Sequence, residues 1–400
     1  MPEAQANQPI TGLLLTGGGA RAAYQVGVLE AIADMRIACG NTDAASPFHI
    51  VTGTSAGAIN ASALATGADQ FDATVRRIVG IWKNFKAQQV YRADTLGVLQ
   101  TGARWLTLLS FGWLLNKWRR VPPKSLLDNS PLLDLLHDVV RLDRLPELIA
   151  TGHLRALAVT ASSYSSGQHV TFFQGIKELV PWVRSQRISV DAVISMEHLL
   201  ASSAIPFIFP SIALKLNGIT EYFGDGSMRQ SAPIAPAIHL GATRVLVIGA
   251  GRMTEPPPDL ATQAPNAYPS LAQIAGHALS NIFLDALAVD VERAQRVNNT
   301  LALIPQEIRQ TSNLRPIELL VIAPSKRLDE AAARHVSALP KAVRTLLSGV
   351  GVSSSVKDAK GAALASYLLF ESVYTTELVE LGYADAYRQE AEVKRFFGWA

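Results

Sequence analysis

The chain has 400 residues, 48% of them hydrophobic, and its formal net charge is +3. Acidic and basic residues are interspersed, which argues against a dedicated nucleic-acid-binding protein, and the single cysteine excludes an intramolecular disulfide or a thiolate metal cluster. No run reaches the roughly 18 apolar residues of a spanning helix, and the N-terminus lacks the basic stretch of a signal peptide. We therefore expect a cytoplasmic protein that can also rest peripherally on a membrane.

The first part of the chain alternates strand and helix signals. Short apolar runs at 12–16 and 48–52 are predicted strands, and each leads into a glycine-containing turn. Helical patterns follow these turns at 20–35 and 58–65. This order predicts parallel strands joined by right-handed crossovers. A further helix is expected over 69–85, with Asp69 as its N-cap.

Strand and helix signals continue through the rest of the chain. Strands are predicted at 154–162, 169–173, 219–223, 244–249 and 317–323. Helices are predicted from Ser130, as N-cap before Pro131, and over 191–202, 233–240 and 271–297, the last as one long helix. The pattern indicates one α/β domain of about 330 residues with helical additions.

Gly53-Thr54-Ser55-Ala56-Gly57 has the form G-x-S-x-G and lies between a predicted strand and a predicted helix. That context is typical of a nucleophile elbow, in which a strained turn exposes the serine hydroxyl at a helix N-terminus. Gly53 and Gly57 leave room for the chain to double back. A glycine-rich connection without chemistry is the alternative interpretation.

Gly17, Gly18 and Gly19 follow the first strand and precede Arg21. Consecutive glycines let backbone N–H groups converge on one point, which is how an oxyanion hole is built. The same letters also fit a dinucleotide-binding loop. That interpretation requires an acidic residue at the end of the second strand, where this chain has GTSAG.

The third motif is Gly224-Asp225-Gly226, at the end of the strand predicted over 219–223. An aspartate between glycines is ordinary turn chemistry when taken alone.

In this order the three motifs resemble the patatin-like phospholipase family. The resemblance extends to TGGGARAAYQVGVL from Thr16, ASSAIPFIFP from Ala201 and PIAPAIHLGA from Pro233, and it covers roughly residues 13–249. It implies a three-layer α/β/α fold with a mainly parallel central sheet. We expect a catalytic domain over 10–325, with an insertion at about 88–123, and a C-terminal helical extension over 326–400.

The resemblance also implies residue roles. Ser55 falls at the nucleophile of a Ser-Asp dyad and Asp225 at its base, while Gly17, Gly18 and Gly19 fall at the oxyanion hole, supported by Arg21. The family's third motif is Asp-Gly-Gly or Asp-Gly-Ala, whereas this chain has Asp225-Gly226-Ser227. A histidine triad is the alternative, with His49 and His239 near the motif segments.

The resemblance implies hydrolysis of phospholipid or lysophospholipid esters through an acyl-enzyme, with no cofactor or metal. Other interpretations are a general esterase or acyltransferase, and a non-catalytic protein that binds a nucleotide, an anion or a lipid.

Residues 104–120 hold Trp105, Trp113 and Trp118, followed by basic residues. This pattern fits a membrane-contacting element or a lid, and it equally fits an insertion helix packed on the core.

Overall fold

The computed structural model describes residues 9–41, 43–93, 125–253, 270–281, 286–309, 311–312, 314–349, 351–352 and 359–399. The strands of the described residues form one ten-stranded sheet. They are β1 (Thr11–Leu15), β2 (Ile50–Thr54), β3 (Ala156–Ser163), β4 (His169–Gly175), β5 (Val183–Arg184), β6 (Arg187–Asp191), β7 (Ile212–Leu216), β8 (Ile219–Asp225), β9 (Arg244–Ile248) and β10 (Glu318–Ile322).

The sheet is parallel in one half and mixed in the other. Its main path runs β10-β9-β1-β2-β3-β4-β6-β5, and the strands from β10 to β3 are parallel neighbours. β4 then pairs antiparallel with β3, and the hairpin of β7 and β8 joins through β3. The predicted parallel arrangement of the first strands is confirmed.

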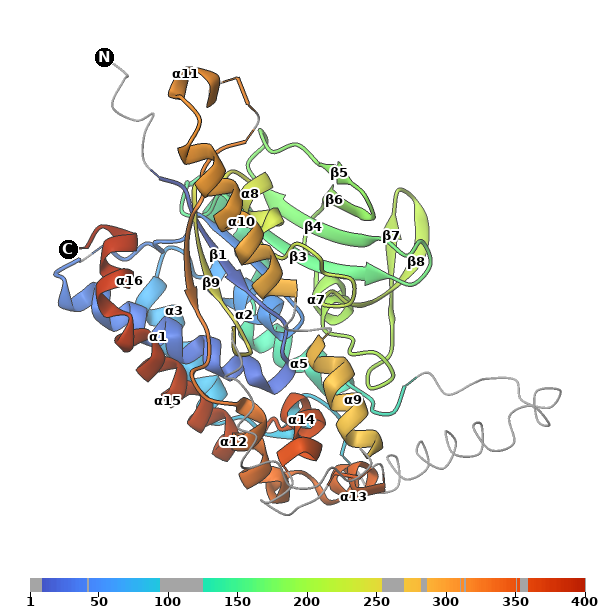
Figure 1. Ribbon diagram of the computed structural model, residues 1–400. Coiled ribbons are helices and arrows are strands. Elements are labelled where there is room, and N and C mark those ends of the chain that lie inside the picture. Colours follow the sequence, from blue (N-terminus) through green and yellow to red (C-terminus); the bar gives the residue numbers. More distant parts are fainter. Residues whose placement is uncertain are drawn as a thin grey trace.

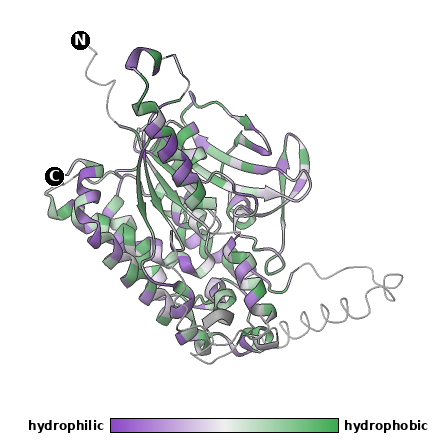
Figure 2. Cartoon of the chain, viewed as in Figure 1, coloured by the Kyte–Doolittle hydropathy of each residue, from purple (hydrophilic) through white to green (hydrophobic). Residues whose placement is uncertain are grey.

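The central strands are buried on both faces. Leu13 and Leu15 of β1 pack into one hydrophobic cluster, and Leu14 packs into a second cluster on the other face. Successive side chains of a strand point to opposite faces, so a sheet covered on both sides needs an uninterrupted apolar run. Figure 2 shows such apolar strands at the centre of the molecule.

The described helices surround this sheet. They are η1 (Gly19–Ala22), α1 (Ala23–Ala38), α2 (Ala56–Ala65), α3 (Phe71–Lys83), η2 (Ala87–Gln89), α5 (Ser130–Val139), η3 (Leu142–Arg144), α6 (Leu145–Ala150), α7 (Met196–Ser202), α8 (Ala235–His239), α9 (Leu271–Ser280), α10 (Ala286–Ala302), α11 (Gln306–Arg309), α12 (Leu328–His335), η5 (Val336–Ala338), α13 (Lys341–Gly349), α14 (Ala359–Leu368), α15 (Ser372–Arg388) and α16 (Glu390–Phe397).

Helices cover both faces of the sheet, as expected for a three-layer α/β/α fold (Figure 1). α1, α3 and α15 belong to the layer on one face, and α8 and α10 cover the other. α15 packs along α1 through two glycines. A Cβ on Gly27 would lie 1.8 Å from the Val379 carbonyl oxygen, and one on Gly382 would lie 2.0 Å from that of Tyr24. The backbones of α1 and α15 are therefore in direct contact at these two glycines.

Three sequence-based assignments are wrong. Residues 187–191 form β6, and only Met196–Ser202 of the expected 191–202 helix is helical, because the first residues pair with β4. The range expected as one helix over 271–297 is helical where it is described, in α9 and α10, and residues 282–285 between them lie outside the described residues. α9 packs on α14, whereas α10 buries Leu287 in the cluster of the opposite face.

The other two errors concern helix caps. Asp69 does not cap α3, since Gln70 precedes the helix and the Asp69 carboxylate binds Arg144 at 2.7 Å instead. Ser130 is the first residue of α5 and Asn129 precedes it.

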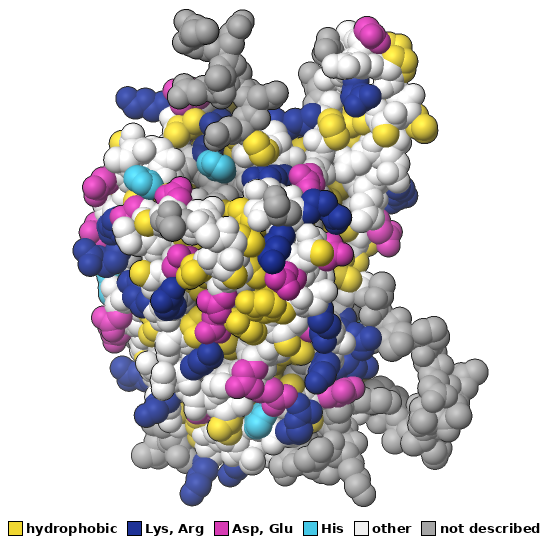
Figure 3. Space-filling model, turned by 90° about the vertical axis from the view of Figure 1, so that its left-hand side faces the viewer, with side chains coloured by type: hydrophobic (Ala, Val, Ile, Leu, Met, Phe, Trp, Pro, Cys, Tyr) yellow, Lys and Arg dark blue, Asp and Glu magenta, His cyan; other side chains and the backbone are white. Residues whose placement is uncertain are grey.

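Acidic and basic side chains alternate with apolar ones over the described part of the face in Figure 3, consistent with the balanced charge of the sequence. Among the described helices, none has both the length and the apolar character needed to cross a bilayer. Trp105, Trp113 and Trp118, on which the predicted membrane-contacting element depends, lie outside the described residues.

Candidate active site

Ser55 occupies the sharp turn between β2 and α2. Its backbone has φ 56° and ψ −135°, a conformation that costs a non-glycine residue on the order of 1–3 kcal/mol. The flanking glycines make the turn sterically possible. A Cβ on Gly53 would lie 2.5 Å from the Gly57 carbonyl oxygen, and one on Gly57 would lie 2.4 Å from that of Leu15. The local sequence therefore explains why the chain can hold Ser55 in this strained position.

The sheet brings Asp225 to Ser55 along one edge of β3. β2 pairs with this edge up to Thr54, opposite Thr160. β4 occupies the other edge, so β8 pairs with β3 where β2 has ended, and Asp225 lies opposite Ala161. The ends of β2 and β8 thus meet at neighbouring positions of β3, although Ser55 and Asp225 are 170 residues apart in the chain.

The Ser55 hydroxyl donates a hydrogen bond to Asp225 Oδ2 at 2.6 Å. The other carboxylate oxygen, Oδ1, accepts the backbone N–H of Ser227 at 2.8 Å. Ser55 is 1% exposed and Asp225 is fully buried. Burial raises the pKa of Asp225 to about 6, even though hydrogen bonds from Ser55 and the Ser227 backbone act to lower it. The carboxylate is therefore a stronger base than an exposed aspartate.

Ser202, at the end of α7, holds both halves of this pair in place. Its hydroxyl oxygen accepts the Ser55 N–H at 2.9 Å and donates to the Thr160 carbonyl at 2.6 Å, while its own carbonyl accepts the Gly226 N–H at 3.2 Å. Sequence reasoning missed Ser202, because no local pattern indicates that α7 ends against the serine turn.

We predict that Ser202→Ala lowers kcat for ester hydrolysis about tenfold and the free energy of unfolding by about 1–3 kcal/mol, because the buried Ser55 N–H loses its acceptor. Urea denaturation and steady-state kinetics measure the two effects. Ser62→Ala is the comparison variant. Ser62 is fully buried outside the pocket beside Ser55, and its hydroxyl has no hydrogen-bond partner among the described residues, so both losses should be smaller. An unchanged kcat in Ser202→Ala would contradict the positioning role.

The histidine near the pair is one that the sequence did not single out. His169 of β4 is 3% exposed, and its Nε2 lies 2.9 Å from the Gly226 carbonyl oxygen, which can only accept. Burial lowers the pKa of His169 to about 4, so the ring is neutral and supports the aspartate turn.

The two histidines considered for a triad are engaged elsewhere. His49 Nδ1 accepts the Thr11 N–H at 3.1 Å, and His239 stacks on Trp182 with ring centroids 4.8 Å apart. Neither of these rings is among the described hydrogen-bond partners of Ser55 or Asp225.

The glycine loop lies against the serine turn. Gly19 has φ 55° and lines the same pocket as Ser55 and Ala56. A Cβ on Gly19 would lie 2.3 Å from the Tyr367 carbonyl oxygen, and one on Gly18 would lie 2.6 Å from the Ala250 Cβ. Only glycine fits at these two positions. In the first turn of α2 the N–H groups of Ala58 and Ile59 bond to the Ser55 carbonyl at 2.8 and 3.4 Å, whereas those of Ala56 and Gly57 have no acceptor among the described residues.

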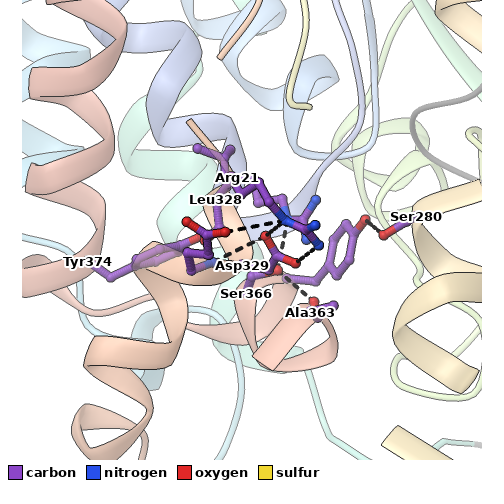
Figure 4. A network of polar contacts seen from close by, with 10 residues as sticks. Arg21, Ser280, Leu328, Asp329, Ala363, Ser366 and Tyr374 are labelled. Atoms are coloured by element: carbon purple, nitrogen blue, oxygen red, sulfur yellow. Dashed lines mark hydrogen bonds and ion pairs between the residues drawn. The ribbon is translucent and has the colours of Figure 1, made fainter. Parts of the chain in front are cut away.

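Arg21 ties the glycine loop to the C-terminal helices. Its side chain extends toward α12 and α14 (Figure 4), donating from Nε to Ser366 Oγ at 2.7 Å. The guanidinium lies 4.2 Å from the centroid of the Tyr367 ring. Burial raises the pKa of Asp329, but the hydrogen bond from Arg327 and the charges of Arg327 and Arg21 bring it below its ordinary value. Arg21 is thus a positioning residue for the loop.

A pocket of about 50 Å³ opens beside Ser55. Most of its lining side chains are hydrophobic, and we call it the apolar pocket. Its walls come mainly from α2, α3, α5 and the segment after α7, with Phe370 from the C-terminal part of the chain. The larger wall residues include Ile59, Ile78, Trp82, Leu135, Phe209 and Phe370. The sequence indicated neither this pocket nor the contribution of Phe370.

Solved structures show weak similarity to the chain. VipD from Legionella pneumophila is 14% identical over 93% of this chain and 67% of VipD, with a TM-score of 0.33. The type III effector protein ExoU is 16% identical over 90% of this chain and 77% of that one, with a TM-score of 0.28. Full-length ExoU in complex with SpcU, from the type III secretion system of Pseudomonas aeruginosa, is 19% identical over 41% of this chain and 35% of that one, with a TM-score of 0.20.

A search of curated proteins found no match to the chain. A family model described as patatin-like phospholipase matches residues 13–238, more than half of the chain and the part that holds Ser55, Asp225 and the glycine loop. The chain belongs to the patatin-like phospholipase family.

Proposed function

We propose that the protein hydrolyses carboxylic esters of phospholipids or lysophospholipids through a Ser55–Asp225 dyad and an acyl-enzyme. Family membership makes it a lipid hydrolase in the broad sense. The single observation that carries the finer proposal is the buried 2.6 Å hydrogen bond from Ser55 Oγ to Asp225 Oδ2, at a strained strand-to-helix turn.

In the first half-reaction Ser55 Oγ attacks the ester carbonyl carbon, and Asp225 accepts the hydroxyl proton. The negative charge that develops on the carbonyl oxygen is stabilised by N–H groups of the glycine loop and the first turn of α2. The tetrahedral intermediate collapses, the C–O bond to the alcohol breaks, and Asp225 returns the proton to the leaving alkoxide. Ser55 is left as an acyl ester.

In the second half-reaction a water molecule attacks the acyl carbon and Asp225 accepts its proton. Collapse breaks the bond to Ser55 Oγ, which recovers the proton, and releases the fatty acid. The raised pKa of Asp225 supports this sequence, since a carboxylate with a pKa of about 6 is a better base at neutral pH than one with a pKa near 3.8.

The lipid character of the substrate is inferred from the apolar pocket. The pocket adjoins Ser55, and apart from Gly19, Ser55, Asn60 and Ser203 its described lining residues carry aliphatic or aromatic side chains. Its amide residue, Asn60, is already engaged: Oδ1 accepts the Trp82 indole N–H at 2.9 Å, and Nδ2 donates to Ala22 and Gln25. Such a wall makes dispersion contacts with an acyl chain. A polar substrate group in the same place would have no hydrogen-bond partner.

Narrowing the pocket should change chain-length preference. Leu135 lines the pocket and is only partly buried, so Leu135→Trp fills space without forcing a residue into the tight core. We expect hydrolysis of palmitoyl esters to fall at least about tenfold, relative to butyryl esters, as the long chain loses apolar contact.

The matched control is Leu133→Trp, on the same helix with similar exposure but outside the pocket lining. Rates of fatty-acid release from phosphatidylcholine, lysophosphatidylcholine and short-chain esters give the comparison. Equal loss of long-chain and short-chain hydrolysis in Leu135→Trp would argue against an acyl-chain site.

A further inference from the structure

A second pocket lies on the other side of the aspartate turn, and we call it the polar pocket. Its volume is about 390 Å³, and it shares no lining residue with the apolar pocket. The residues after Asp225 form one wall, the hairpin between β5 and β6 forms another, and Asn281 and Ala286 close it. The lining side chains that matter here are Gln186, Arg187, Ser227, Arg229, Gln230 and Ser231.

The polar pocket is cationic. Arg187 and Arg229 both line it, and the other lining residues that the structure describes are uncharged. The Arg187 side chain is partly buried and makes neither a hydrogen bond nor an ion pair with any described residue, while its charge acts to lower the pKa of the buried Asp290 carboxyl. Arg229 donates from one nitrogen to the Gly167 carbonyl, which leaves its other N–H groups available. Guanidinium groups prefer tetrahedral oxyanions, which they bind through two parallel hydrogen bonds.

A further observation concerns the backbone of the pocket wall. Arg229 has φ 65°, a conformation that an arginine adopts at a cost and that recurs at functional positions. Ser227 is 2% exposed, and its hydroxyl faces the Asp225 carboxylate, whose pKa it acts to lower. The pocket therefore combines a strained arginine and a second guanidinium with a wall that adjoins the aspartate.

The polar pocket is connected to both members of the dyad. Gln230 Nε2 donates to Thr54 Oγ1 at 2.9 Å, one residue before Ser55. The Ser227 N–H donates to Asp225 Oδ1, and Arg187 lies opposite His169, which supports the same turn. Occupancy of the pocket therefore bears directly on the residues that position the base.

We propose that the polar pocket binds a phosphate-type oxyanion, held by Arg187 and Arg229 with the hydroxyl of Ser231. The phosphodiester of a lipid head group and free inorganic phosphate share this chemistry. The site is independent of the proposed hydrolysis, because anion binding is measured without turnover.

Isothermal titration of inorganic phosphate into full-length protein carrying Ser55→Ala tests the proposal in low-salt buffer. Arg187→Gln and Arg229→Gln should each weaken phosphate binding at least about tenfold, as each removes a charge-assisted hydrogen bond. The matched control is Arg184→Gln, an exposed arginine of the same hairpin that does not line the pocket and should change the affinity less than about twofold. Equal weakening by all three substitutions, or binding that does not saturate, would overturn the proposal.

A second measurement needs no arginine variant and so does not depend on how well one folds. Phenylglyoxal modifies accessible arginines, and peptide mass spectrometry follows each site separately. Phosphate should slow modification of Arg187 and Arg229 severalfold while leaving Arg184 unaffected. Equal rates with and without phosphate at all three arginines would refute the site.

Competition identifies the source of the anion. If glycerophosphocholine displaces phosphate, the pocket accepts a phosphodiester and suits a lipid head group. If phosphate binds and glycerophosphocholine does not displace it, the ligand is a free phosphate. Either result supports the shared chemistry, and hydrolysis by the wild-type protein is scored separately.

Discussion

Replacement of Ser55 by alanine should lower kcat for lipid ester hydrolysis at least about 10⁴-fold and leave the fold intact. The substitution removes the attacking oxygen and the hydrogen bond to Asp225, whereas the glycine loop and the apolar pocket remain. KM should therefore change much less than kcat. Rates of fatty-acid release, with circular dichroism as a check on folding, provide the measurement.

The matched control for this variant is Ser62→Ala, two turns further along α2. Ser62 is fully buried and lies outside the apolar pocket, so its loss should leave kcat within about threefold. A fluorophosphonate probe adds an independent readout. It should label wild type and Ser62→Ala at Ser55 and should not label Ser55→Ala. Wild-type turnover in Ser55→Ala would end the proposed mechanism and favour a non-catalytic lipid-binding or anion-binding role.

Asp225→Asn should abolish most activity and yet stabilise the protein at pH 7.5. Loss of the base should lower kcat about 10²–10⁴-fold. The carboxyl is fully buried, and its pKa is about 6 in the folded state against 3.8 ordinarily. Between these values the folded state holds the proton that the unfolded state has released, so stability falls as pH rises and the loss is complete above about pH 6.

The asparagine removes this burial cost, since it is neutral at every pH and nearly the same shape. We expect Asp225→Asn to gain up to about 3 kcal/mol in the free energy of unfolding at pH 7.5 and little at pH 4, as measured by urea denaturation. Asp134→Asn, at an exposed position, is the control and should change neither stability nor activity. A variant that is less stable than wild type at pH 7.5 would contradict the pKa assignment.

The same pKa fixes the pH profile of the wild-type enzyme. Only ionised Asp225 can accept the Ser55 proton, so kcat/KM should fall about tenfold per pH unit below about pH 6.

The sequence predicted those parts of the site whose geometry is local. A serine between glycines is sterically suited to a strained turn wherever a strand meets a helix, and the triple glycine permits a close backbone approach. The position of Asp225 was predicted only through the family resemblance. Its approach to Ser55 requires β8 to pair with β3 at the position where β2 ends, and that pairing joins segments far apart in the chain.

The errors have the same physical origin. The helix expected over 191–202 starts only at Met196, because β4 offers residues 187–191 a parallel partner and holds them in a strand. Tertiary pairing overrides local periodicity there. The cap expected at Asp69 is absent because its carboxylate binds Arg144 instead. Ser202 and His169 were missed for the same reason: their roles arise from hydrogen bonds to turns distant in sequence.

The contact of the Tyr367 carbonyl with Gly19, together with Phe370 in the wall of the apolar pocket, bears on how the chain can be divided. A fragment ending near residue 325 would retain every described strand, Ser55 and Asp225. It would lose the carbonyl that contacts the glycine loop and one wall of the apolar pocket. The helices after residue 326 therefore complete the surroundings of Ser55, and shortened versions of the gene should be designed to keep them.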